Sequence, residues 1–446
     1  MSRAALDAPP WFGQPRGLTV LFLTNMWEQF SYFGMRALLV YYMTKQLLVA
    51  QGTASLIYGT YTACAYFTPI VGGVIADRLL GKRRAIIIGA SVMAAGHFMM
   101  GFENLLYVAL ATIALGNGLF LPTLPSQIND LYAEGDPRRG WAYNVYYLGI
   151  NIGGFLAPLV CGTLGEVFGW HVGFGAAGLG MLVGLVIYLW GQRYLPAEQG
   201  RAKAVPAPAG PVVARGRMGL PTVLVLAAVA LSVTVFRGAY EQAGNTVALW
   251  ADAGVDRTLG SWTVPMTWFQ SLNPLLVMAM TPMLLAGWKT RAGSGRDTSP
   301  ALRMATGALI VAGAYLMLCA VDAFSGGKAH WLWLVAFFGV YTFGELFILP
   351  TGLGLFARLA PPGFGATTVA AWYLTIFAGS LCAGLVGTLW SRMPHTAYFA
   401  LLAALAVVAA ILLRLIDPWA RRVEASGRPS DPPIAVDNSP IGIKVS

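Results

Sequence analysis

Long apolar runs alternate with short polar segments along the whole chain. Each run approaches or exceeds the roughly 20 residues that a helix needs to cross a bilayer. The runs cover residues 18–48, 55–76, 84–101, 105–128, 141–168, 172–194, 220–251, 261–288, 302–321, 331–358, 365–391 and 395–415. The pattern predicts an all-α polytopic membrane protein with 12 transmembrane helices.

The first apolar run carries a polar stripe. Its members lie at i, i+3, i+4, i+7 and i+11, which is one face of a helix. They are Asn25, Glu28, Gln29, Tyr32 and Arg36. Ionisable residues are costly in lipid, so the stripe is expected to face a cavity or a bundle interior. Simple helix packing is one interpretation, and a substrate and ion pathway is the one we favour.

A segment rich in Pro, Ala and Gly interrupts the apolar pattern in mid-chain. It has basic residues and no apolar run, so it is typical of a flexible linker. The predicted units are an N-terminus (1–17), a six-helix bundle (18–194), the linker (195–219), a second six-helix bundle (220–415) and a polar tail (416–446).

Basic residues are distributed unequally between the two sides of the predicted membrane. With a cytoplasmic N-terminus, 23 of the 29 Lys and Arg residues fall on the cytoplasmic side. The other side holds Lys45, Arg257, Lys328 and Arg392, and only Arg36 and Arg237 lie within spans. The positive-inside rule therefore predicts a multi-pass protein of the cell (inner) membrane with both termini cytoplasmic. It also accounts for the net charge of +10 without a nucleic-acid partner.

The composition and the scarcity of reactive clusters narrow the function further. The chain is 57% hydrophobic and 11% charged, which excludes an ordinary soluble domain. Its four cysteines stand in separate spans without metal-ligand spacing, and no nucleophile–base set or phosphate loop is apparent. We expect no enzyme activity, no metal and no bound cofactor. His97 in the third span is expected to pack between helices.

Several motifs resemble known transporters. The segment GGVIADRLLGKRR after the second span resembles the loop 2–3 signature of the major facilitator superfamily. Within that superfamily the chain resembles the proton-dependent oligopeptide transporter (POT) family. The resemblance is carried by FSYFGMRALLVYYM, YGTYTACAYFTPIVGGVIADR, YNVYYLGINIGGFLAPLVCGTLGEVFGWHVGF, EQAGNTVALW and GELFILPTGLGLFARLAPPGFGATTVAAWYLT.

The resemblance implies a major facilitator fold, with two six-helix bundles rocking around a central site. It also implies uptake of di- and tripeptides or related compounds, driven by inward proton flow. The linker is too short for additional helices, so the chain resembles a twelve-helix variant. The expected partners are a small peptide-like substrate and the lipid bilayer, and we expect a monomer.

The resemblance also assigns roles to individual residues. Glu28 and Glu241 are the expected proton-coupling carboxylates, with Glu241 paired to Arg36, and Glu345 is expected at the amino end of the substrate. The other residues expected to bind substrate are Tyr32, Phe33, Arg36, Tyr66, Asn151, Asn273 and Trp372. A peptide zwitterion in a cavity needs opposite charges on opposite walls, which these residues supply. Static ion pairs between helices remain an alternative interpretation of the carboxylates.

Three positions depart from the family pattern. Asn25 replaces the first Glu and Gln29 the Arg of the family's Glu-x-x-Glu-Arg-Phe signature, and Leu121 stands where span four usually has Lys. The three charged residues are replaced together. Removing only one member of a buried charge network would leave its partner unpaired, which costs about 3–5 kcal/mol of stability. Arg237 precedes Glu241 by one helical turn and is a candidate replacement in the substrate site.

Three hypotheses therefore stay open. The first is a transporter of short peptides or peptide-like compounds with an altered proton-coupling network. The second is a transporter of another cargo, such as nitrate, a modified amino acid or a peptide-like natural product. The third is a membrane receptor that binds a substrate without transporting it, which substrate stabilisation without uptake would reveal.

Overall fold

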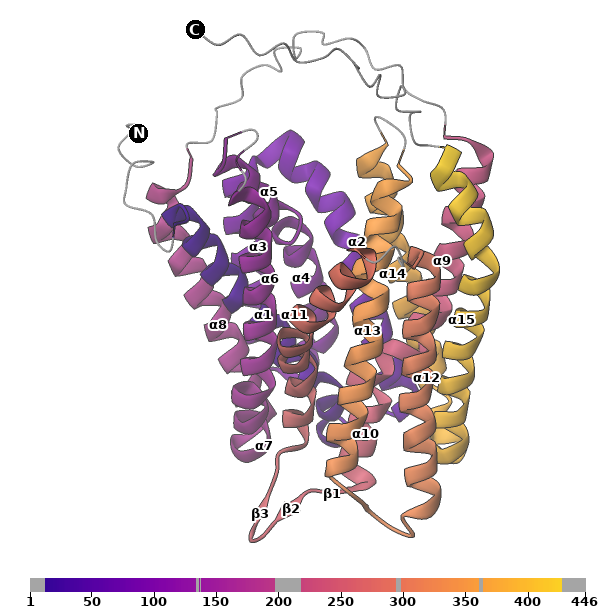
Figure 1. Cartoon of the computed structure of the whole chain (residues 1–446). Coiled ribbons are helices and arrows are strands. Elements are labelled where there is room, and N and C mark those ends of the chain that lie inside the picture. The colour runs from indigo at the N-terminus through magenta and orange to yellow at the C-terminus, as the bar shows by residue number, and fades with distance from the viewer. Residues whose placement is uncertain are drawn as a thin grey trace, which may run out of the picture.

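The computed structural model describes residues 13–133, 136, 138–196, 218–293, 298–360 and 364–426. Almost all of these residues are helical, and the helices run roughly side by side (Figure 1). The central part of the predicted linker (197–217) and the end of the predicted tail (427–446) lie outside the described residues.

The part of the chain before the linker, here the N-half, consists of helices of different lengths. They are α1 (Arg16–Tyr41), α2 (Gln51–Ile75), α3 (Lys82–Met99), α4 (Leu106–Phe120), α5 (Thr123–Asp130), α6 (Arg138–Ala157), α7 (Thr163–Phe168) and α8 (Trp170–Gly191). Short π and 3-10 segments extend or join them at Tyr42–Gln46, Ala76–Leu80, Glu103–Leu105, Pro158–Gly162 and Gln192–Tyr194. Because α5 continues α4, and α7 continues α6, these helices make six crossings.

The part after the linker, here the C-half, repeats this arrangement. Its helices are α9 (Leu220–Tyr240), α10 (Thr246–Ala253), α11 (Leu272–Gly293), α12 (Pro300–Phe324), α13 (Leu332–Arg358), α14 (Gly365–Gly387) and α15 (His395–Ser426). The 3-10 segments are Glu241–Gly244, Met266–Ser271 and Trp390–Arg392. Four two-residue strands lie at one end: β1 (Val255–Asp256), β2 (Thr258–Leu259), β3 (Trp262–Thr263) and β4 (Ala329–His330). β1 pairs in parallel with β4, and β2 pairs antiparallel with β3.

Ten helical segments of the described chain are long and apolar enough to cross a membrane. The helices α1 and α3 account for the other two predicted spans. Helix α3 begins with Lys82, Arg83 and Arg84, and α1 carries the polar stripe, so charged and polar residues interrupt the apolar character of both. The all-α membrane fold is therefore confirmed.

Two predicted boundaries were wrong. The eighth span was expected from residue 261, but β2 and β3 form a hairpin there and the helical turn begins only at Met266. Span twelve was expected to end at 415, yet α15 continues to Ser426 through Pro418. Asp417 stabilises this extension by accepting bonds from Ser299 and, at 2.9 Å, from Arg421 Nε.

The two halves are in close contact where α2 crosses α14. A Cβ atom added to Gly59 would lie 2.8 Å from the carbonyl oxygen of Ser380, so only a glycine permits this approach. Beside it, Ser55 Oγ donates to Asn245 Oδ1 (3.0 Å) and Gln51 Nε2 to the Gly387 carbonyl (3.0 Å). Bonds between the halves thus extend from this crossing to the end that carries the strands.

Polar contacts made by Glu166 and Lys45, here called the latch, join the two halves at the strand-bearing end. From the N-half, Glu166 on α7 accepts bonds from the backbone N–H groups of Met266 and Thr267 (3.0 Å each) and from the Thr267 hydroxyl (2.7 Å). Lys45 Nζ lies 2.6 Å from Asp252 Oδ2 on α10. Toward the opposite end, where α5 lies, the ribbons of the two halves diverge (Figure 1).

Candidate functional site

A cavity of about 290 Å³ lies between the two halves of the molecule. It is bordered by residues from α1, α2, α6, α9, α11 and α13. Eight of the residues predicted for the site line it: Phe33, Arg36, Tyr66, Asn151, Arg237, Glu241, Asn273 and Glu345. The structure therefore brings together residues that are up to about 300 positions apart in the sequence.

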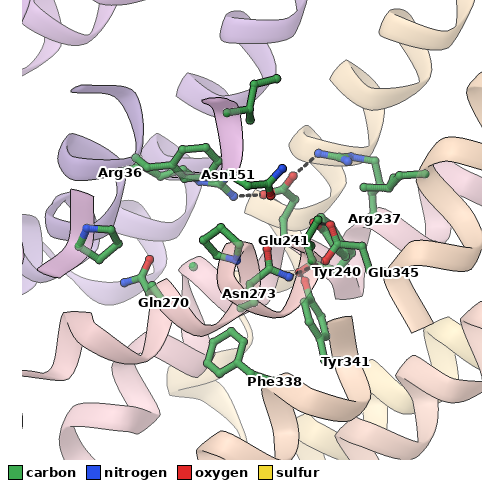
Figure 2. Close-up of a pocket in the computed structure, with 18 of the residues that line it drawn as sticks. Arg36, Asn151, Arg237, Tyr240, Glu241, Gln270, Asn273, Phe338, Tyr341 and Glu345 are labelled. Carbon is green, nitrogen blue, oxygen red and sulfur yellow. Dashed lines mark hydrogen bonds and ion pairs between the residues drawn. The ribbon is translucent and has the colours of Figure 1, made fainter. Parts of the chain in front are cut away.

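A carboxylate held by two arginines forms one wall of the cavity. Glu241 begins the 3-10 turn after α9, and its two oxygens accept bonds from Arg36 of the N-half and Arg237 of the C-half. Figure 2 shows Glu241 between these guanidinium groups. Since Arg237 precedes Glu241 by four residues, the α9 helix itself brings the two side chains together. The cluster carries two positive charges and one negative charge.

The guanidinium of Arg237 also lies against aromatic rings. It is 5.5 Å from the ring centroid of Tyr66 on α2 and 5.4 Å from that of Tyr240, which are distances for cation–π attraction. Its side chain is 3% exposed, and its Nε has no hydrogen-bond partner among the described residues. Arg36 is held in addition by the Tyr58 hydroxyl, which accepts a 2.6 Å bond from Arg36 Nε. Arg237 thus uses only part of its fork of donors in the bond to Glu241.

A second carboxylate, Glu345 on α13, is surrounded by neutral donors. Its Oε1 accepts a 2.7 Å bond from the Tyr240 hydroxyl, and its Oε2 a 2.5 Å bond from Asn273 Nδ2 on α11. Asn273 also donates to the Thr342 hydroxyl (3.0 Å). Glu345 forms no ion pair with the described residues. Its negative charge is available for a cation that enters the cavity.

Aromatic and amide side chains complete the lining. Asn151 on α6 borders the cavity and donates to the Tyr147 carbonyl at 2.9 Å, one helical turn earlier. Phe33 and Tyr66 contribute apolar surface from α1 and α2. Such a mixture of apolar walls and a few polar groups is typical of a small-molecule site.

Two aromatic residues predicted for the site do not line the cavity. Tyr32 is 8% exposed and stacks on Tyr61 within the N-half, with ring centroids 6.4 Å apart. Trp372 on α14 packs edge-on against Phe356 at 5.3 Å and belongs to the C-half core. Both side chains pack between helices here, and their expected role in substrate binding stays a prediction.

Glu28 also lies outside the cavity lining, within the N-half. It is 1% exposed, and the partner of its Oε2 is the side-chain amide of the adjacent Gln29, at 2.7 Å. No ion pair to Glu28 occurs among the described residues. Of the altered positions, Asn25 donates to the Tyr146 carbonyl at 3.1 Å, and Leu121 is half-buried at the end of α4. The replacements Asn25 and Gln29 therefore form hydrogen bonds instead of ion pairs.

Sequence reasoning missed several lining residues, including Tyr147, Tyr240, Gln270, Phe338 and Tyr341. Helical spacing could have identified some of them. Phe338 and Tyr341 precede Glu345 by seven and four residues, which places all three on one face of α13. Tyr240 is adjacent to Glu241, and its carbonyl accepts a 2.6 Å bond from the Tyr341 hydroxyl.

His97, predicted to be a packing residue, is fully buried in α3, and neither ring nitrogen has a partner among the described residues. In the described part of the chain, no group of His, Cys, Asp and Glu is arranged to hold a metal ion.

Comparisons with known proteins agree with this architecture. A family model described as the POT family matches residues 83–215 and 214–404. The chain is 31% identical to the uncharacterised transporter YclF of Bacillus subtilis, over 92% of this chain and 95% of that protein. It is 29% identical to a di-/tripeptide transporter of Lactococcus lactis subsp. cremoris, over 91% and 96%.

The fold is also similar to that of solved transporters. A mutant of the peptide transporter POT, crystallised in complex with alafosfalin, superimposes with a TM-score of 0.84 at 30% identity. The similarity covers 94% of this chain and 98% of that chain. The protein is therefore an integral membrane transporter rather than an enzyme, and it belongs to the POT family of the major facilitator superfamily.

Proposed function

We propose that this protein imports di- and tripeptides or closely related zwitterions by alternating access between its two halves. The observation that carries the proposal is the placement of opposite charges around one cavity. Arg36 and Arg237 lie at one wall, and Glu345 lies at another without a cation of its own. The similarity to a di-/tripeptide transporter and to a peptide transporter bound to alafosfalin supports this cargo.

In this proposal the two carboxylates have different roles. Glu345 binds the substrate ammonium, because it is accessible from the cavity and already oriented by Tyr240 and Asn273. Arg237, which lines the cavity, binds the substrate carboxylate once its guanidinium is released from Glu241. Arginine suits this role because its fork of donors matches the geometry of a carboxylate. Asn151, Phe33 and Tyr66 hold the intervening peptide unit.

Proton coupling is assigned to Glu241 and Glu28. A proton on Glu241 would release Arg36 and Arg237, which are then free to meet the substrate. Glu28 is buried without a cation, which is costly for an ionised carboxylate and favours a carboxyl that binds a proton during the cycle. The proton is thus the coupling ion of the transport cycle. Its two proposed binding groups, Glu241 and Glu28, lie in different parts of the molecule.

The proposed location is the inner membrane, with both termini in the cytoplasm and the chain acting as a monomer. The excess of basic residues on one side supports this orientation. The proposed rigid units are residues 18–194 and 220–415, joined by the linker 195–219 with the tail from 416. The latch of Glu166 and Lys45 then closes the outer side, so that this conformation faces the cytoplasm.

The test uses purified protein in liposomes. Dialanine inside the vesicles should drive uptake of labelled dialanine by counterflow, and an inward proton gradient should drive net accumulation with acidification of the lumen. Dialanine binding without counterflow would instead establish a receptor. Counterflow with nitrate or an amino acid, but with no peptide, would establish another cargo.

A further inference from the structure

A second hollow lies in the C-half and shares no lining residue with the central cavity. It has a volume of about 450 Å³ and is bordered by α11 and α13. Its walls include Met280, Met283, Trp288 and Phe347, and Arg291 is the charged residue at its end. On α11 these side chains recur at helical spacing, so they form a continuous stripe along one face.

The hollow has the length of an acyl chain within one leaflet. From Met280 to Arg291 a helix rises about 17 Å, close to half of the roughly 30 Å hydrocarbon core of a bilayer. Its walls consist mainly of methionine and aromatic side chains, which adapt to flexible apolar ligands. Met283 is 76% exposed, so the stripe is open to the surrounding lipid.

Positive charge is concentrated at one end of this groove. The guanidinium of Arg303, at the start of α12, lies over the ring of Trp288 at 4.9 Å from its centroid. Lys289 and Arg291 lie in the last turns of α11, so three basic residues belong to this part of the described chain. A tryptophan and several arginines at the end of a spanning helix are typical of the membrane–water interface.

We propose that this groove between α11 and α13 is a binding site for an anionic phospholipid. One acyl chain lies along Met280, Met283 and Phe347, and the phosphate headgroup is bound by Arg291 and Arg303 beside Trp288. The charge complementarity selects an anionic headgroup, and the apolar length selects an intact lipid over free phosphate. The groove takes its lipid from the membrane leaflet on the basic side of the protein.

The test measures lipid binding by the full-length purified protein. Delipidated protein in detergent is heated with phosphatidylglycerol, phosphatidylcholine of the same acyl chains, or inorganic phosphate, and bound lipids are counted by native mass spectrometry. Phosphatidylglycerol should raise the Tm and remain bound, and the other two should not. Equal stabilisation by phosphatidylcholine would overturn the assignment of an anionic headgroup. Stabilisation by inorganic phosphate would overturn the proposal that the ligand is an intact lipid.

Variants separate the two parts of the site. The double substitution R291Q/R303Q should weaken phosphatidylglycerol binding about tenfold or more, while R291K/R303K should retain most of it. Gly287→Phe should also weaken binding with all charges intact, because a Cβ at Gly287 meets no atom within 4 Å and the ring can fill the groove. Arg139→Gln, an exposed arginine at the same end of the N-half, is the control and should change nothing.

Unchanged lipid binding in both R291Q/R303Q and Gly287→Phe would overturn the proposal. The readout is lipid binding rather than uptake, so its result does not depend on the proposed transport of peptides.

Discussion

Arg237 binds the carboxylate of Glu241 one helical turn later on the same wall of the cavity. Arg36 of the N-half binds the other oxygen of that carboxylate. One negative charge is therefore shared by two positive charges from opposite halves of the molecule. This pair places Arg237 at the wall of the cavity, although Gln29 and Leu121 stand where the family pattern has cations.

Substitution of Arg237 by Gln should weaken substrate binding while leaving the Arg36–Glu241 pair in place. A hydrogen bond to a charged group contributes about 1.5–3 kcal/mol, so the KM for dialanine should rise about 10- to 100-fold. Dialanine amide, which lacks the carboxylate, should be affected much less. Competition uptake in liposomes measures both.

Arg392→Gln is a suitable control, because this arginine is exposed near the strand-bearing end. An equal loss of affinity for dialanine and dialanine amide in Arg237→Gln would show that Arg237 is structural and does not contact the substrate carboxylate.

Glu345→Gln should remove the negative charge that meets the substrate ammonium. The KM for dialanine is expected to rise at least about tenfold, because a charge-assisted bond is lost. N-acetyl-dialanine, which has no ammonium, should bind the variant and the wild type equally poorly. Uptake competition with both compounds tests this.

Tyr240→Phe provides the matched control for Glu345. It removes the 2.7 Å bond that orients the carboxylate but keeps its charge, so its effect should be smaller than that of Glu345→Gln. A larger effect in Tyr240→Phe would assign the amino-end site to the tyrosine instead.

Glu28→Gln should separate proton coupling from substrate binding. The variant keeps the shape of a buried side chain that touches Gln29 and lies outside the cavity lining. Thermal stability should therefore be unchanged or slightly higher, since a buried group without a cation is replaced by a neutral one. Counterflow of dialanine should persist, while accumulation driven by a proton gradient should fall strongly.

Counterflow of dialanine and accumulation driven by a proton gradient are compared on the same vesicles. If accumulation driven by protons persists at the wild-type level in Glu28→Gln, Glu28 is excluded from coupling, and Glu241 remains the candidate proton site.

Glu166→Gln should weaken the closure of the strand-bearing end. The carboxylate accepts three bonds from the C-half, and a Gln side chain presents an amide N–H to one of those donors. A lost acceptor for a buried donor costs about 1–3 kcal/mol, which is enough to populate an alternative conformation. Spin labels at Gln46 and Leu259 should report a longer distance in a larger fraction of molecules.

The control for Glu166 is Lys328→Gln, an exposed residue at the same end. An unchanged distance distribution in Glu166→Gln would mean that the α2–α14 crossing and Lys45 are sufficient to keep this end closed.

Much of the fold was predictable because hydrophobicity is a strong signal in membrane proteins. The apolar runs predicted ten helices that are long and apolar enough to cross a membrane, and also α1 and α3, whose polar residues make them the weakest signals. Errors occurred where local polarity did not determine structure. The eighth run included the β2–β3 hairpin, because Trp262 is apolar without being helical, and α15 passes through the polar Asp417 and Pro418.

The charged part of the site was also predictable, because charges within spans are costly and have few acceptable positions. Arg36, Arg237, Glu241 and Glu345 all line the cavity. The aromatic part was predictable only in part, since Phe33 and Tyr66 line the cavity. Tyr32 and Trp372 turn into helix interfaces while Phe338 and Tyr341 face the cavity, and hydrophobicity alone does not distinguish these two environments. Which aromatic side chains face the cavity depends on the rotation of each helix about its axis, and tertiary packing determines that rotation.

The charges around the central cavity have an electrical consequence. Its charged lining residues are two arginines and two glutamates, which sum to zero when all are ionised. A zwitterionic peptide adds no net charge, so the loaded and empty cavities interact equally with the membrane potential. Each coupled proton, in contrast, gains about 2.3 kcal/mol per 100 mV. The electrical current per transported peptide should therefore equal the number of protons that accompany it.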